Sequence, residues 1–124
     1  MTLRDLHADF SWVVVGTNAA VGAWALAAHW EERLRTKHLW RATVVAELTI
    51  VLQVVLGVAL VAAEDVEVAP FHAFYGFVAL ATIGIVYSYR HQLRPHLHLL
   101  YGLGGLFLMG LALRAITISP VPSP

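Results

Sequence analysis

Hydrophobic residues run through the chain in four long stretches, separated by short segments that carry most of the charge. Each stretch has about the 20 residues with which an α-helix crosses the hydrocarbon core of a bilayer. Because the connections are short, consecutive helices should be antiparallel neighbours. The pattern predicts an all-α integral membrane protein, an up-down-up-down four-helix bundle that forms one domain over residues 1–124. The expected helices cover residues 10–30, 39–63, 70–90 and 96–117.

The composition supports the membrane interpretation and narrows the chemistry. Hydrophobic residues make up 59% of the chain and charged residues 13%, which is outside the range of ordinary soluble domains. The formal net charge is zero, so we expect no nucleic-acid partner. The absence of cysteine excludes disulfides, thiolate metal sites and covalent c-type haem attachment. Histidine, carboxylate, hydroxyl and amide chemistry remain.

The distribution of basic residues predicts the orientation in the membrane. By the positive-inside rule, loops rich in lysine and arginine stay in the cytoplasm. Only Arg4 and Arg114 belong to the opposite side, which also carries the acidic segment 64–67. We therefore expect a multi-pass protein of the bacterial cytoplasmic membrane with both termini outside. The residues that set this orientation are Arg33, Arg35, Lys37 and Arg41 in and beside the first loop, and Arg90 and Arg94 in the second.

Small residues mark helix contacts in lipid, because they let two backbones approach closely. The first helix carries two such stripes on nearly opposite faces, which predicts protein contact on both sides; the alternative is that alanine is simply common in this chain. The glycines of the fourth helix predict helix contact too, or a passage for a flat molecule. The stripes are Gly16, Ala20, Ala23 and Ala27, then Asn18, Gly22 and Ala25; the glycines are Gly102, Gly104, Gly105 and Gly110.

Two amide side chains lie inside the predicted spans. Asn18 precedes Trp30 by 12 residues and Gln53 follows Trp40 by 13, so both should lie roughly 18 to 20 Å from the cytoplasmic interface. Equal depth on adjacent helices predicts a hydrogen bond between the two amides that fixes the helix register. A ligand or quinone contact is the alternative interpretation.

Glu47 is the only acidic residue deep inside a predicted span, and an intramembrane carboxylate is a candidate functional group. It should lie about 10 Å from the cytoplasmic interface. Either it carries a function or it locks the bundle as a neutral or salt-bridged side chain. The expected partners are Tyr101, His98, Tyr87, Arg90 or Arg41.

Histidines offer one possible cofactor site. A b-type haem needs two facing imidazoles at the same depth. His29 or His38 opposite His98 would meet this requirement if a haem were bound, but each sits at the interface, where water and head groups satisfy imidazole. We predict neither a metal site nor a catalytic residue, because the sequence contains no nucleophile triad, phosphate loop or zinc signature.

Three segments carry a resemblance to a known group of proteins. Together they resemble a family of small actinobacterial four-helix membrane proteins, over most of the chain from Trp40 onward. The resemblance implies an accessory subunit of the respiratory cytochrome bcc and aa3 oxidase supercomplex, without its own cofactor, that lies between larger subunits and holds lipid. Seven arginines against one lysine fit a high-GC bacterium. The segments are residues 71–77 (FHAFYGF), 87–90 (YSYR) and 99–110 (LLYGLGGLFLMG).

Three functions are compatible with these observations. The first is a non-catalytic accessory or assembly subunit of a larger bacterial membrane complex, in contact with larger membrane subunits and lipids. The second is an electron carrier that binds b-haem or quinone. The third is a small transporter or proton channel that uses Glu47, with Gln53 and Asn18. Small size, two small-residue faces and the lack of a recognisable reaction centre favour the first.

Overall fold

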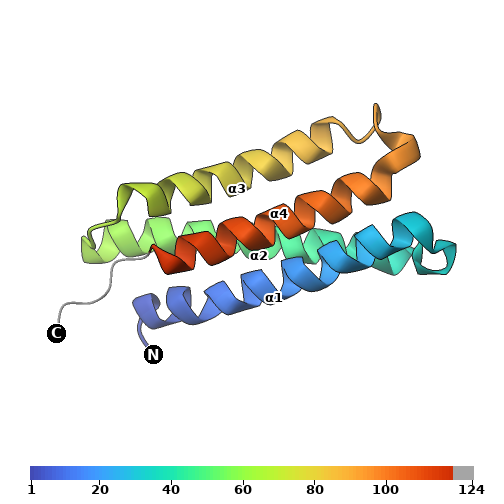
Figure 1. Cartoon of the computed structure of the whole chain (residues 1–124). Helices are drawn as coiled ribbons and strands as arrows, with labels where there is room; N and C mark the ends of the chain where they lie inside the picture. Colours follow the sequence, from blue (N-terminus) through green and yellow to red (C-terminus); the bar gives the residue numbers. More distant parts are fainter. Residues whose placement is uncertain (119–124) are drawn as a thin grey trace.

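The structure, a computed structural model, describes residues 1–118 and contains four long antiparallel helices (Figure 1). All four are long and apolar enough to cross a membrane, which confirms the predicted all-α bundle and indicates a multi-pass membrane protein. The elements are α1 (Leu3–Trp30), the 3₁₀ turn η1 (Glu32–Leu34), α2 (Lys37–Glu64), α3 (Pro70–Ser88), the 3₁₀ turn η2 (Arg94–His96) and α4 (Leu97–Thr117).

The first helix begins seven residues before the predicted boundary at residue 10. Thr2 and Asp5 form a capping box: the Asp5 amide donates to the Thr2 hydroxyl at 3.1 Å, and the Thr2 amide donates to the Asp5 carboxylate at 3.2 Å. These bonds satisfy backbone donors that would otherwise be open at the helix start. Hydropathy marks only the part of a helix that lies in lipid, so it missed the polar first turns.

The other helix ends lie within two residues of the predictions. Pro70 occupies the first turn of α3, where its missing N–H leaves no helical bond unmade. α2 ends at Glu64 because Asp65 adopts the left-handed conformation, with φ of 50°. α3 ends two residues earlier than predicted, at Ser88, and η2 precedes α4.

Glycines bring α1 and α4 into the closest helix contact of the bundle. A Cβ added to Gly102 would lie 2.6 Å from the Leu26 Cα atom, and one added to Gly105 would lie 2.9 Å from the Gly22 Cα atom. Neither position leaves room for a methyl group. The stripe of Asn18, Gly22 and Ala25 therefore faces the interior and packs on α4, as the small residues predicted.

The helices do not contact one another equally. α1 packs on both α4 and α2, and α3 packs on α4, whereas α2 and α3 touch only sparsely. α1 begins and α4 ends at the same end of the bundle as the connection between α2 and α3, which we call the terminal end (Figure 1). The opposite end holds the other two connections and six cationic side chains, and we call it the basic end. Its cations are Arg33, Arg35, Lys37, Arg41, Arg90 and Arg94.

Candidate functional site

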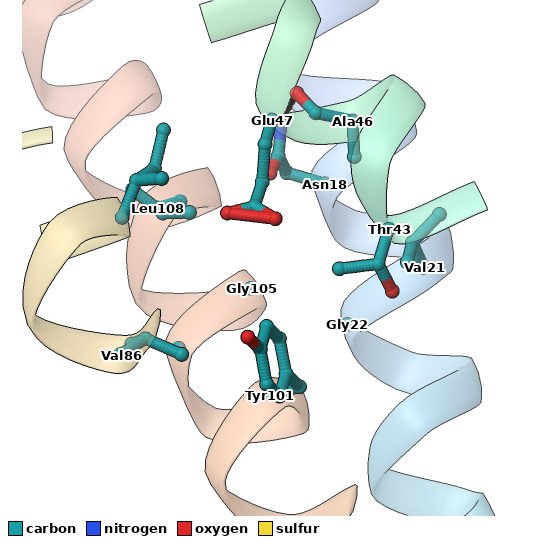
Figure 2. A pocket seen from close by; sticks show the side chains of 12 residues that line it. Asn18, Val21, Gly22, Thr43, Ala46, Glu47, Val86, Tyr101, Gly105 and Leu108 are labelled. Carbon is teal, nitrogen blue, oxygen red and sulfur yellow. Dashed lines mark hydrogen bonds between the residues drawn. The ribbon is translucent and has the colours of Figure 1, made fainter. Parts of the chain in front are cut away.

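A small cavity between the four helices collects most of the polar side chains predicted inside the membrane. Asn18 from α1, Glu47 from α2 and Tyr101 from α4 all line it, and α3 closes it with Ile83 and Val86 (Figure 2). The space open to the centre of a water molecule is about 20 Å³, which is enough for about one water. Three of the four predicted intramembrane polar side chains therefore meet at one level of the bundle.

Asn18 is the most buried polar residue, with 2% of its surface exposed. Its amide nitrogen donates to the Val14 carbonyl at 2.9 Å and to the Ala46 carbonyl of α2 at 3.3 Å. The same Ala46 carbonyl accepts from the Thr49 hydroxyl, which lies 3.3 Å from the Thr17 hydroxyl of α1. Asn18 thus fixes the register of α1 against α2, through the backbone of α2.

The predicted bond between Asn18 and Gln53 is wrong. Gln53 lies nearer the terminal end, where its amide nitrogen donates to the His7 carbonyl at 2.7 Å. Ala46, which Asn18 reaches, is seven residues from Gln53, or roughly 10 Å along the helix. The prediction assumed that Trp30 and Trp40 lie at the same depth in the membrane. Trp30 is the last residue of α1, however, whereas Trp40 lies one turn inside α2. The two counts therefore started at different depths.

His7 is a contact residue that the sequence interpretation missed, because the first helix was expected to begin at residue 10. Its ring packs over Gly57, where an added Cβ would lie 3.1 Å from the His7 Cε1 atom. The His7 and His72 rings meet edge to face, with centroids 6.1 Å apart. The Thr2 and Asp5 pair was the signal that could have placed His7 inside a helix.

Glu47 is half-buried, and its carboxylate points into the cavity from the side opposite Tyr101 (Figure 2). Of its expected partners, Tyr101 shares the cavity. Within residues 1–118, no side chain forms a hydrogen bond or an ion pair with the Glu47 carboxylate. The group therefore has neither the salt bridge nor the hydrogen bond expected of an acid that locks a bundle.

The histidines proposed for haem lie at the basic end but contact other partners. The His29 ring lies 5.9 Å from the His96 ring, and the His98 ring lies 5.1 Å from Trp40. His38 is exposed. Among the described residues, neither ring contact joins two of the predicted ligands. Within the same residues, no three histidine or carboxylate side chains lie close enough together to hold a metal ion.

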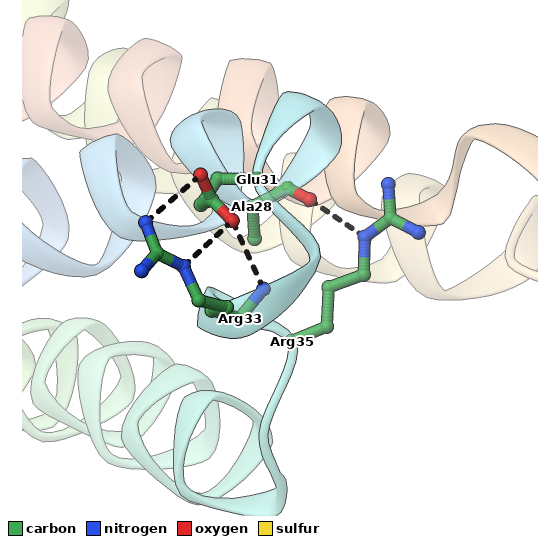
Figure 3. A network of polar contacts seen from close by, with 4 residues as sticks. All are labelled: Ala28, Glu31, Arg33 and Arg35. Carbon is green, nitrogen blue, oxygen red and sulfur yellow. Dashed lines mark hydrogen bonds and ion pairs between the residues drawn. The ribbon is translucent and has the colours of Figure 1, made fainter.

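The connection between α1 and α2 is held by arginines whose roles differ (Figure 3). Arg35 donates to the Ala28 and His29 carbonyls, both at 2.7 Å, and so caps the end of α1. Arg33 pairs instead with Glu31 at 3.1 Å. The hydrogen bonds from Arg33 hold the pKa of the exposed Glu31 carboxyl below its usual range. The sequence assigned both arginines only to membrane orientation.

One face of α1 contacts nothing in the bundle. Gly16, Ala20, Ala23 and Ala27 are all exposed, and a Cβ added to Gly16 would meet no atom within 4 Å. Trp12 and Trp30, which are 60% and 73% exposed, bound this small-residue face at its two ends. The predicted stripe of small residues opposite Asn18 therefore faces away from the bundle.

Comparisons of the chain with protein-family models, with curated proteins and with solved structures gave no match. The findings identify a small four-helix protein with four candidate membrane spans, and no family.

Proposed function

We propose that this chain is a non-catalytic accessory or assembly subunit of a larger bacterial membrane complex, and that the small-residue face of α1 binds a transmembrane helix of a larger subunit. The exposed face of Gly16, Ala20, Ala23 and Ala27 is the observation that carries the proposal. In lipid, hydrophobicity does not drive helices together, and close backbone approach across small residues does.

The other lipid-facing surfaces differ from this face. α2 exposes large aliphatic side chains such as Val44, Leu48 and Val55, and α3 exposes Phe71 and Phe77. Such bulky side chains keep neighbouring backbones apart and suit contact with lipid tails. The face of α1 is smooth over the distance between Trp12 and Trp30, roughly 27 Å, which is close to the thickness of the hydrocarbon core. It therefore offers a full membrane depth for a second helix.

The identity of the partner rests on the resemblance to small actinobacterial four-helix membrane proteins. On that basis the partner is a subunit of the cytochrome bcc and aa3 oxidase supercomplex. The central cavity has room for about one water molecule and not for a porphyrin or a quinone, so an electron-carrier role would need a site elsewhere, such as the basic end. A visible absorption spectrum of protein produced with ample haem tests the b-haem alternative.

Co-purification from native membranes in mild detergent tests the proposal. We expect the tagged chain to retain a larger integral membrane subunit, and the double variant Gly16→Leu with Ala20→Leu to lose it. The matched control is Gly84→Leu with Gly110→Leu, because both glycines are exposed and an added Cβ meets nothing there. The proposal would be contradicted if the first variant retained the larger subunit, or if both variants lost it equally. It would also be contradicted if the wild-type chain, extracted from its native membrane, purified without any partner. If the chain co-purified only with a second copy of itself, the partner at this face would be that copy and not a larger subunit, and the proposal would be wrong.

A further inference from the structure

A second cavity opens at the basic end, between the start of α2 and the connection from α3 to α4. Its volume is about 350 Å³, within the range of roughly 300 to 1,000 Å³ that small-ligand pockets occupy. We call it the basic cavity. It is lined by Trp40, Arg90, His91, Arg94, Leu97 and Tyr101.

The two arginines of the basic cavity are not neutralised. Within residues 1–118, the single ion pair joins Arg33 to Glu31 on the other connection, and no carboxylate lines this cavity. Each guanidinium offers five N–H donors. Arg90 gives one to the Tyr87 carbonyl at 2.7 Å, and Arg94 gives one to the His91 Nδ1 atom at 3.1 Å. Their remaining donors have no acceptor in the described protein.

Local contacts hold these cations in place. The Arg90 guanidinium carbon lies 3.6 Å from the centre of the Tyr87 ring, a cation–π contact. α4 begins at Leu97, which lines the cavity, and the Leu97 amide donates to the Arg94 carbonyl of η2. Two guanidinium groups that line one cavity and have no carboxylate partner among the described residues provide a site for a phosphate group.

The walls indicate that this phosphate belongs to a lipid. The candidate span of α3 ends at Ser88 and the next one begins at Arg94, so we expect Arg90 and Arg94 at the level of the head groups. Trp40 and Leu97 make part of the wall apolar, and beside the cavity Tyr89 and Leu93 are 51% and 38% exposed. A free phosphate ion gains nothing from such surroundings, whereas a phospholipid places its glycerol and first methylenes against them.

We propose that the basic cavity binds the head group of an anionic phospholipid, with the phosphate held by Arg90 and Arg94. This inference does not depend on the proposed subunit role, because it concerns another end of the molecule and another class of ligand. Basic pockets between membrane helices bind such head groups by the attraction between cationic side chains and anionic lipid.

Native mass spectrometry of the delipidated full chain in detergent tests this proposal. The probes are phosphatidylglycerol and phosphatidylcholine with identical acyl chains. Both lipids carry the phosphate, but the two arginines repel the choline ammonium of phosphatidylcholine, so phosphatidylglycerol should bind about tenfold more tightly. We expect Arg90→Gln with Arg94→Gln to reduce its affinity to that of phosphatidylcholine. Equal binding of both lipids by the wild type would overturn the proposal.

Three further arms separate a site from general attraction. Lys37→Gln with Arg41→Gln removes the same charge from the same end but outside the cavity, and should cost less than about twofold. Arg90→Lys with Arg94→Lys keeps the charge and should keep the lipid preference, which shows that positive charge at these two positions carries it. An unchanged thermal unfolding temperature of the glutamine variant in detergent shows that its loss does not come from misfolding. Millimolar inorganic phosphate should leave phosphatidylglycerol bound. Displacement by phosphate, or an equal loss in the control variant, would overturn the proposal.

Discussion

At the scale of single residues, the absence of a side chain decides how closely α1 and α4 approach. Gly22, Gly102 and Gly105 lie backbone to backbone across this contact, whereas Gly16 and Gly110 have open space around them. The sequence predicted a contact role for all of these small residues. It could not separate the two groups, because a glycine has the same pattern of neighbours along a helix whether it faces another helix or lipid.

Substitution of these glycines by alanine should therefore have opposite effects. In Gly102→Ala, the new methyl group would lie 2.6 Å from both the Cα and the amide nitrogen of Leu26, and backbone atoms cannot move aside cheaply. We expect a loss of about 1 to 3 kcal/mol in the free energy of unfolding. Gly110→Ala should be neutral or stabilising by up to about 1 kcal/mol, through helix propensity. Thermal unfolding in detergent micelles measures both, and equal melting temperatures would refute the glycine contact.

At the scale of elements, hydropathy predicted that each helix exists, and local side-chain chemistry determined where it ends. A bilayer leaves no alternative to a helix for 20 apolar residues in a row, since every backbone group must bond internally. The ends lie outside this constraint. The start of α1 depends on the bonds between Thr2 and Asp5, and its end on Arg35, which acts across seven residues from Ala28. The hydropathy pattern still placed the end of α1 correctly at residue 30, but it carried no signal for the capping box at its start.

The cap at the end of α1 gives a prediction at this scale. Arg35→Gln removes two charged hydrogen bonds to the Ala28 and His29 carbonyls, so we expect a loss of about 1 to 2 kcal/mol in stability and faster hydrogen exchange in the last turn of α1. Arg33→Gln is the matched control. It removes the same charge from the same connection but breaks only an exposed ion pair, worth less than about 1 kcal/mol. An Arg33 variant that loses as much as the Arg35 variant would show that charge, and not the cap, matters.

At the scale of the whole molecule, the bundle and its two ends followed from the sequence, but the pairing of its polar groups followed only in part. Glu47 and Tyr101 were expected to meet, and they line one cavity. Asn18 and Gln53 were expected to bond, and they lie on different levels. Depth counted from an interface was in error here by roughly 10 Å, or about two helical turns, which is larger than the reach of an amide hydrogen bond. Only the packed contacts between helices fix the register that closely.

The separation of charge between the two ends predicts which way the bundle crosses the membrane. The positive-inside bias favours keeping the six cations of the basic end in the cytoplasm. Only Arg4 and Arg114, at the terminal end, favour the reverse orientation. The chain has no cysteine, so single-cysteine variants report one position each.

Glu32→Cys at the basic end and Glu64→Cys at the terminal end both replace an exposed carboxylate and are matched in charge. A membrane-impermeant maleimide added to intact cells should label the variant at position 64 and should reach position 32 only after lysis. The reverse pattern would place the basic cavity outside, in conflict with the charge rule on which the orientation depends. Labelling of both variants in intact cells would mean that the chain inserts in both orientations. The basic end would then face the cytoplasm in some molecules and the outside in others.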